Sequence, residues 1–333
     1  MAPLYRRMAA VLSALSAALV LAALLGIGGG SSGLGGITEV VGILFGRESQ
    51  TPMLSDIVWR IRLPRTLLAA LVGSSLSLGG LVFQALLRNP LAEPYILGIS
   101  GGSAVGAIIG ILLGLARFPG VCLCAFVGSM ATLILVLVMA AGENRLQKDA
   151  LLLSGVMLNA FCSAGIMFLV SLTQDARLHN ILFWLMGDLS LGSLKEAGVL
   201  AGLVLPCFLV IFAFSHPMNL LLMGRETAAT LGVNTAAATV ALLTVTSLMV
   251  SVTVSYCGLV GFVGLVMPHL LRLALGPDHR ILVPACILGG GAYLILCDLL
   301  ARILPEQGEM PTGVITAMIG APLFILLLRR SRS

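Results

Sequence analysis

The sequence has very little charge. Only 10% of its 333 residues are Asp, Glu, Lys or Arg, whereas a soluble domain is typically about 25% charged. Hydrophobic residues make up 59% of the chain, and its mean hydropathy is +1.09. So few charges cannot cover a surface that faces water, so most of the surface must face lipid. The composition therefore excludes the pair of soluble domains that the length alone would suggest.

Lysine is almost missing. The chain has only Lys148 and Lys195, and neither follows a glycine. A P-loop needs the pattern G-x-x-x-x-G-K-[ST], in which the lysine reaches the phosphates. The sequence therefore has no P-loop, and any uphill transport must draw on an ion gradient or on a separate ATPase. A gradient-driven carrier usually has ionisable residues within its spans, and the predicted span interiors have almost none.

Metal-binding and catalytic patterns are also missing. The seven cysteines include no C-x-x-C pair and lie in or beside apolar runs, which is typical of packing residues. None of the four histidines has metal-site spacing with a second ligand. No Ser/His/Asp or Cys/His set has a supporting context, so we expect no metal, no cofactor and no enzymatic chemistry. The net charge of +5 comes from basic residues beside apolar runs, which indicates no nucleic-acid partner.

Apolar runs of the length that spans a membrane, about 20 residues, are abundant. The predicted spans are Met8–Ile27, Leu63–Leu87, Tyr95–Leu115, Pro119–Ala141, Ala150–Leu172, Glu196–Phe214, Ala236–Tyr256, Gly258–Leu275, Ile281–Ile303 and Thr312–Leu328. The first span follows two arginines, and a basic segment before an apolar run is also typical of a secretory signal. The apolar run of about 20 residues is longer than that of a typical signal, which favours an uncleaved span. The sequence thus predicts an all-α, polytopic membrane protein of about ten transmembrane helices.

An even number of spans puts both termini on the same side of the membrane. Of the 19 Lys and Arg residues, eleven lie in segments on that side, a weak bias that assigns both termini to the cytoplasm. The inner loop at residues 215–235 contains GRETAATLGVN, in which good helix formers lie between two glycines. This pattern predicts a short helix at the cytoplasmic face, available to a partner.

A group of arginines, Arg60, Arg62 and Arg65, lies in the first outer loop, on the side that disfavours positive charge. Such residues either have a use there or lie at helix ends and extend toward the interface, and the charge pattern leaves both interpretations open. Near the outer end of the ninth span, Asp298 and Arg302 lie four residues apart. This is the spacing of an ion pair along a helix.

Glycine recurs at every fourth position in RNPLAEPYILGISGGSAVGAIIGILLG, residues 88–114. The stripe consists of Gly98, Gly102, Gly106, Gly110 and Gly114. In lipid no hydrophobic force drives helices together, and small residues allow their backbones to approach closely. We expect this stripe to pack against a neighbouring helix.

Three long segments resemble the FecCD family, the permeases of ABC importers for iron–siderophore complexes, haem and cobalamin. They are RIRLPRTLLAALVGSSLSLGGLVFQALLRNPLAEPYILGISGGSAVGA (60–107), GLVGFVGLVMPHLLRLALGPDHRILVP (258–284) and CDLLARILPEQGEMPTGVITAMIGAPLFILLL (297–328). GRETAATLGV at 224–233 is similar to the family's cytoplasmic segment between spans six and seven. The resemblance implies a ten-helix subunit that pairs with a second copy of itself. It also implies two ATPase subunits at the cytoplasmic face and a periplasmic or lipid-anchored binding protein outside.

The resemblance also implies roles for individual residues. Binding-protein docking would fall to Arg62, Arg65 and Arg302, whereas Arg60 gains no such role. Coupling to the ATPase would fall to Gly224, Arg225, Glu226, Leu231 and Gly232. A cytoplasmic gate would consist of Asn89, Leu91, Gln147, Lys148 and Asp149. In some members this gate carries small hydroxyl residues, a pattern from which Lys148 and Asp149 depart.

We therefore interpret residues 1–333 as one transmembrane permease domain in the cell (inner) membrane, with a cytoplasmic coupling segment at about 215–235. The resemblance implies a bulky ligand, an iron–siderophore, haem or cobalamin complex, and iron–siderophore complexes are the most frequent in the family. A gradient-driven secondary carrier is the alternative, and it would transport without an ATPase. An intramembrane enzyme would need a catalytic set at membrane depth, and none is visible in the sequence.

Overall fold

The structure is a computed structural model, and it describes residues 2–29, 37–44, 52–141, 148–173, 175–190, 192–305 and 308–330. Helices form the regular structure of these ranges. In chain order they are α1 (Ala2–Gly28), α2 (Ile37–Leu44), α3 (Pro52–Ile57), η1 (Val58–Arg62), α4 (Leu63–Leu87), η2 (Pro94–Leu97), α5 (Ile99–Leu112), η3 (Arg117–Val121), α6 (Cys122–Ala140), α7 (Lys148–Ser171), α8 (Asp175–Leu185), α9 (Leu194–Ala213), α10 (Ser215–Met223), α11 (Arg225–Thr230), α12 (Thr235–Cys257), α13 (Val263–Leu275), α14 (His279–Ile303) and α15 (Thr312–Arg330).

The membrane spans follow the expected order. Seven of the described helices are long and apolar enough to cross a membrane, and three shorter apolar helices, in α5, α13 and α15, accompany them. Together they correspond to the predicted spans, and α4 has the bounds expected of the second. The all-α polytopic fold is thereby confirmed.

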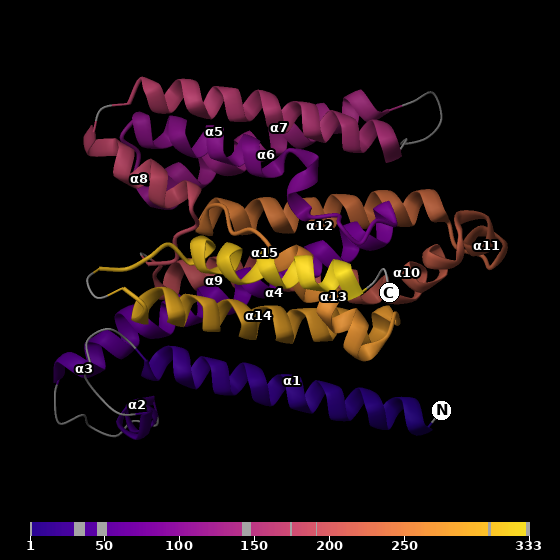
Figure 1. Cartoon of the computed structure of the whole chain (residues 1–333), viewed down its shortest axis with the longest axis horizontal. Helices are drawn as coiled ribbons and strands as arrows, with labels where there is room; N and C mark the ends of the chain where they lie inside the picture. The colour runs from indigo at the N-terminus through magenta and orange to yellow at the C-terminus, as the bar shows by residue number, and fades with distance from the viewer. Residues whose placement is uncertain are drawn as a thin grey trace.

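The two ends of the bundle carry different short elements. Figure 1 shows both chain ends together with α10 and α11 at one end, and α2, α3 and α8 at the other. We call these the inner end and the outer end. The placement of both chain ends together is what an even number of crossings requires.

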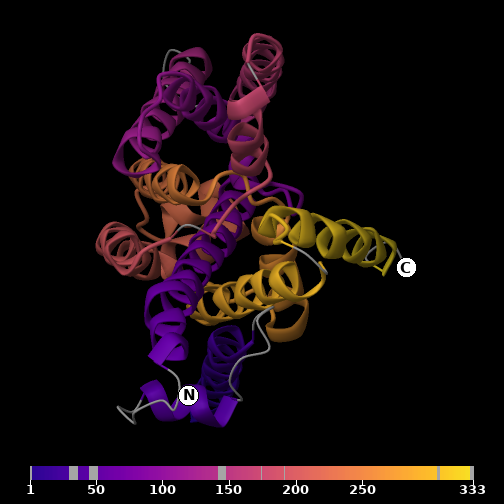
Figure 2. The same ribbon diagram turned by 90° about the vertical axis from the view of Figure 1, so that its left-hand side faces the viewer.

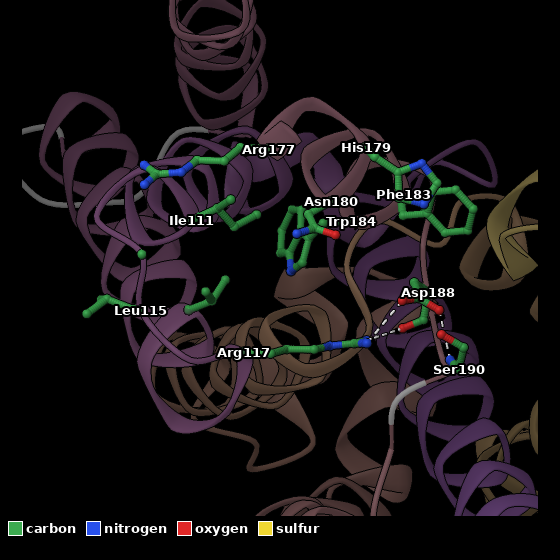
Figure 3. A pocket seen from close by; sticks show the side chains of 12 residues that line it. Ile111, Leu115, Arg117, Arg177, His179, Asn180, Phe183, Trp184, Asp188 and Ser190 are labelled. Carbon is green, nitrogen blue, oxygen red and sulfur yellow. Dashed lines mark hydrogen bonds and ion pairs between the residues drawn. The ribbon is translucent and has the colours of Figure 1, made fainter. Parts of the chain in front are cut away.

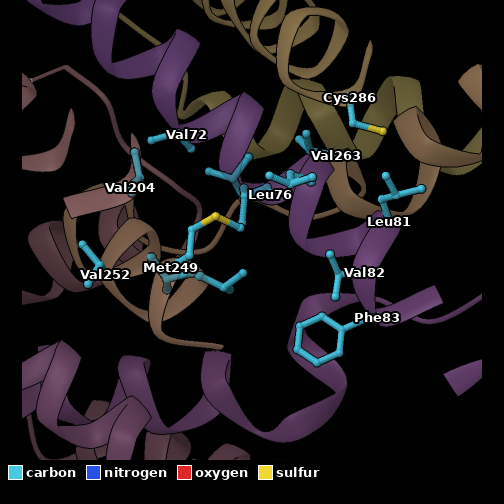
Figure 4. Close-up of a cluster of buried hydrophobic side chains, with 14 of the residues drawn as sticks. Val72, Leu76, Leu81, Val82, Phe83, Val204, Met249, Val252, Val263 and Cys286 are labelled. Carbon is cyan, nitrogen blue, oxygen red and sulfur yellow. The ribbon is translucent and has the colours of Figure 1, made fainter. Parts of the chain in front are cut away.

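The core of the bundle lies around α4. Of its most apolar stretch 83% is buried, against 17% for α1 and for α7. It packs against α14, α13, α12 and α9, and Figure 2, seen from the outer end, shows it running through the middle of the bundle. In Figure 4 its side chains Leu76 and Phe83 lie in one apolar cluster with Met249 of α12 and Val263 of α13. The positions of α9, α12, α13 and α14 are therefore set by their packing against α4.

Close backbone contacts join α4 to two of these neighbours. An alanine Cβ built at Gly73 would lie 2.2 Å from the carbonyl oxygen of Gly290 in α14. One built at Gly80 would lie 1.7 Å from the carbonyl oxygen of Gly264 in α13. No side chain fits at either position unless a helix moves. Such contacts substitute for the hydrophobic force that lipid does not supply between helices.

The glycine stripe does not lie in one helix. Gly102, Gly106 and Gly110 lie in α5, and a Cβ built at Gly106 would meet the backbone of α6 at 2.1 Å. Gly98 and Gly114 lie outside α5, with φ angles of 75° and 72°. Glycine adopts this region without steric cost, so the chain turns at both positions. The prediction of a single span through all five glycines is therefore wrong.

The eighth span also differs from its prediction. α13 begins at Val263 rather than at Gly258, because residues 258–262, which we call the strap, are irregular. The last strap residue, Phe262, has φ 66°, a left-handed conformation that is an outlier for a bulky side chain. α13 has 13 residues and is about 20 Å long, less than the ~30 Å of the hydrocarbon core. Its first turn, residues 263–266, is buried within the bundle.

Candidate functional site

An ion-pair cluster lies where α4, α14 and α15 meet at the outer end. Asp298 is fully buried and accepts hydrogen bonds from Arg65 Nε at 2.9 Å and from Thr312 Oγ1 at 3.0 Å. Its other carboxylate oxygen lies 3.2 Å from Arg302 Nε. Glu309 pairs with Arg65 Nη1, and its side chain is 39% exposed. Two carboxylates thus balance two buried guanidinium groups, which keeps their charges compensated away from water.

Arg302 of this cluster and the neighbouring Arg62 also bond the C-terminal end of α1. Arg62 Nη1 donates to the carbonyl oxygens of Ile27 and Gly28, each at 3.1 Å. Arg302 Nη2 donates to the carbonyl oxygen of Gly26 at 2.9 Å. The last carbonyls of a helix lack partners within it and carry partial negative charge. The two guanidinium groups therefore stabilise the end of α1 and hold it against α4 and α14.

The fold brings Arg62, Arg65 and Arg302 together at the outer end. These residues are only 4%, 2% and 5% exposed, and their side chains have partners within the chain. Direct contact with another protein requires them to exchange those partners for its acidic groups. Their docking role stays a prediction. Arg60 differs, because it is exposed and pairs with Asp56 at 3.2 Å.

The predicted coupling segment folds into α10 and α11 at the inner end. Gly224 and Gly232, with φ angles of 125° and 86°, bound α11 on either side. Left-handed glycines of this kind allow the sharp turns that set a short helix apart from its neighbours. Glu226 and Leu231 are exposed, whereas the side chain of Arg225 lies outside the described part of the chain. Their contact with an ATPase stays a prediction.

Hydrogen bonds fix α10 to the bundle. Asn219 Nδ2 donates to Asp278 Oδ1 at 2.7 Å, and its own Oδ1 accepts from the backbone N of His279 at 2.8 Å. Both partners lie at the start of α14. Arg88, which follows α4, donates from Nη2 to the carbonyl oxygen of Leu221 at 2.6 Å. α10 is therefore bonded both to the start of α14 and to the residue that follows α4.

The predicted gate residues lie at two places. Asn89 and Leu91 belong to residues 88–93, which we call the inner hinge, where Asn89 Oδ1 accepts from the backbone N of Leu91 at 2.9 Å. Lys148 begins α7 and Asp149 is exposed in its first turn. Gln147 and the side chain of Lys148 lie outside the described residues. The gate itself stays a prediction.

The sequence matches the FecCD transport family over residues 15–330. The chain belongs to this family. The chain is 40% identical over 284 residues to the vitamin B12 import system permease protein BtuC of Escherichia coli O9:H4 (strain HS), covering 85% of this chain and 86% of that protein. BtuC of Salmonella arizonae is 42% identical over 276 residues, or 82% and 83% of the two chains.

Two solved structures share the fold of this FecCD chain. An inward-facing structure of a metal-chelate type ABC transporter superimposes with a TM-score of 0.84 at 30% identity, covering 96% of this chain and 99% of that one. PsaBC from Streptococcus pneumoniae, solved with a Fab, shares the fold at 16% identity, with a TM-score of 0.56 over 87% of this chain and 95% of that one. The FecCD chain is thus the membrane subunit of an ABC importer and a multi-pass protein of the inner membrane.

The FecCD chain also contains an outer cavity of about 480 Å³ between α5, η3 and α8 (Figure 3). At one side Arg117 Nη1 pairs with Asp188 Oδ2 at 3.0 Å, and Arg117 Nη2 donates to the backbone oxygen of Asp188 at 2.6 Å. Trp184 of α8 is almost fully buried beside it. The ion pair ties the loop after α8 to η3, which positions α8 over the outer end of α5.

Sequence patterns did not single out Glu309, Asp188 or Arg117. A usable signal was present for the two acids, because the chain has only 14 acidic residues and both Glu309 and Asp188 lie near span ends. Ionisable residues close to membrane depth are expensive and usually have a named partner. What the sequence does not contain is the identity of that partner.

Proposed function

We propose that this FecCD subunit passes a bulky metal chelate through the membrane, delivered by a binding protein and driven by ATP hydrolysis on separate subunits. The observation that carries this proposal is α11, a short helix between two left-handed glycines that is tied through α10 to α4 and α14. The missing P-loop supports a separate ATPase. The names of the relatives, vitamin B12 import and metal-chelate transport, support cobalamin, iron–siderophore or haem complexes as the ligand class.

The transport cycle begins when a loaded binding protein docks at the outer end and releases its ligand into the passage. Closure of the ATPase pair on ATP displaces α11. α10 passes this displacement to α14 through Asn219 and to the inner hinge through Arg88. The hinge carries Asn89 and Leu91, so its movement opens or closes the inner constriction, a rigid-element transition of the hinge type.

Coupling through α11 predicts a loss of ATPase association when its exposed apolar contact is removed. Leu231 is 58% exposed and lies directly after α11. Leu231→Ser is expected to reduce co-purification of the ATPase several-fold, because an exposed apolar anchor contributes most when a partner covers it. The matched control is Leu304→Ser, because Leu304 is 60% exposed and directly follows α14, outside the coupling segment. Equal retention of the ATPase by both variants would argue against this contact.

Docking at the outer cluster predicts a charge-dependent affinity for the binding protein. Arg62→Gln removes one charge while leaving a donor for the carbonyl oxygens of Ile27 and Gly28. We expect about ten-fold weaker binding, equal to 1.4 kcal/mol, with a smaller difference at high salt. The control is Arg60→Gln, which removes an exposed charge nearby. Titration of the binding protein onto the purified subunit measures both, and identical affinities for the two variants would reject the role of Arg62.

We also propose that two copies of the subunit pair around the passage. The support is family resemblance together with α7, which leaves large side chains uncovered in the single chain, among them Phe161 at 76% and Met167 at 74% exposure. Membrane lipid would cover whatever the second copy does not. The expected mass of the detergent-solubilised protein is that of a dimer, measured by light scattering. A monomeric mass in the presence of the ATPase subunits would count against pairing.

A further inference from the structure

The strap is bound to the outer half of the molecule by its backbone. The backbone N of Leu259 donates to the carbonyl oxygen of Trp184 in α8 at 3.4 Å. Directly before the strap, the carbonyl oxygen of Cys257 at the end of α12 accepts from Asp188 N at 2.9 Å. A Cβ built at Gly313, in the first turn of α15, would lie 2.9 Å from the carbonyl oxygen of Leu259. The strap is therefore in direct contact with the end of α8 and with the start of α15.

The opposite side of the strap is bound to the inner hinge and to η2. Glu93, the last residue of the inner hinge, accepts a hydrogen bond at Oε1 from the backbone N of Phe262 at 3.0 Å. In η2 the hydroxyl of Tyr95 donates to the carbonyl oxygen of Val260 at 2.9 Å and accepts from the N of the same residue at 3.1 Å. The strap thus joins the inner hinge to the outer contacts at α8 and α15.

Phe262 is the strained member of this connection. Its φ of 66° and ψ of −21° place it in the left-handed region, where the Cβ of an L-residue crowds its own backbone. It is the residue before the first turn of α13, and the Glu93 carboxylate bonds its backbone N. A carboxylate at this position is favoured by the unpaired N–H groups and by the positive end of the helix dipole. The side chain of Phe262 packs on α15. A Cβ built at Gly320 of α15 would lie 2.5 Å from the Cβ of Phe262.

Strain in the backbone persists only where surrounding interactions hold it. We propose that Glu93 is a positioning residue for transport, which holds Phe262 in the left-handed conformation and so latches the strap to the inner hinge. This rests on the proposed transport function. With the latch formed, a movement of Asn89 and Leu91 in the hinge shifts the strap, and the strap shifts the outer contacts at α8 and α15. The latch therefore couples docking of the binding protein at the outer end to ATP hydrolysis at the inner end, in both directions.

A double-mutant cycle between Glu93 and Phe262 tests this latch. Glu93→Ala is made in three backgrounds: wild type, Phe262→Gly and Phe262→Ala. Both background variants lose the aromatic ring, but only glycine adopts the left-handed conformation without cost. The first readout is the Tm of the purified subunit in detergent. The second is the stimulation ratio, which is the rate of ATP hydrolysis with the binding protein divided by the rate without it. It is measured on the subunit and its ATPase in vesicles, with ATP as the only small molecule added.

Glu93→Ala is expected to lower the Tm by several degrees and the stimulation ratio several-fold in the wild-type and Phe262→Ala backgrounds. In the Phe262→Gly background the fall in the stimulation ratio should be small, because glycine keeps the left-handed conformation without the carboxylate. The fall in Tm should be larger there, because the hydrogen bond to the backbone N is still lost and no released strain offsets it. Equal effects of Glu93→Ala in all three backgrounds would overturn the proposal, and so would an unchanged stimulation ratio. Should Glu93→Ala fail to fold, Glu93→Gln keeps an acceptor oxygen for Phe262 N and is expected to give the same pattern at smaller size.

The two arms of the experiment separate the latch from the function on which it rests. If the binding protein does not stimulate ATP hydrolysis even with the wild-type subunit, the proposed function has failed. The Tm cycle still reports on the latch in that case. Asp56→Ala serves as a control for loss of an acid, because Asp56 is exposed and pairs with Arg60 four residues later in the chain.

Discussion

Asp298→Asn is expected to cause the largest loss of stability of any single charge removal at the outer end. The carboxylate is fully buried and compensates Arg65 and Arg302 together. Removing one partner from a buried ion pair leaves charge without compensation, which typically costs about 3–5 kcal/mol. Glu309 still pairs with Arg65, so Arg302 is the group left worst compensated. Thermal unfolding of the purified subunit in detergent measures the change.

The matched control is Asp56→Asn. Asp56 also pairs with an arginine, but the two side chains are 69% and 81% exposed. An exposed pair four residues apart on a helix contributes about 0.3–0.5 kcal/mol. Unfolding of Asp298→Asn at the same temperature as this control would show that the cluster adds no stability to the fold.

Gly80→Ala is expected to disrupt the contact between α4 and α13. The added Cβ would lie 1.7 Å from the carbonyl oxygen of Gly264, and the next nearest atoms are also backbone. Backbone cannot rotate away as a flexible side chain can, so one helix must move. Overpacking of this kind costs about 1–3 kcal/mol, and occasionally more. A lowered Tm and a reduced yield of folded protein in the membrane fraction are the expected observations.

Gly202→Ala provides the control for this substitution. Gly202 lies in α9, and among the described residues no atom outside its own stretch of helix lies within 4 Å of a Cβ built there. Alanine in a helix interior is more favourable than glycine by about 0.5–1 kcal/mol, so this variant should be as stable as wild type or more so. Equal stability of the Gly80 and Gly202 variants would mean that α4 and α13 do not touch as described.

The spans could be predicted from the sequence because the membrane restricts both their length and their composition. α4 matched its prediction, and α14 begins two residues before the expected Ile281, at His279. The short helix at the inner end was also predictable, because Gly224 and Gly232 stop the helix formers between them. In these cases the signal lies within one stretch of chain.

The partners of buried polar groups could not be predicted, because they lie far apart in the sequence. Arg65 and Asp298 are separated by 233 residues, and no pattern near either one names the other. The same holds for Glu93 and Phe262, which are 169 residues apart. Glycine spacing predicted a packing face but not where a helix would break, because a glycine can serve a close contact or a left-handed turn. Gly98 serves the turn.

The central claim is that this subunit is a passage without an energy source of its own, driven by a separate ATPase. The most direct test is uptake of a bound metal chelate into vesicles that hold the subunit, its ATPase and its binding protein. Uptake is expected with ATP and an active ATPase, and no uptake is expected with an ATPase that binds ATP but cannot hydrolyse it. Uptake that continues with the inactive ATPase, or that follows an imposed ion gradient instead, would contradict the account.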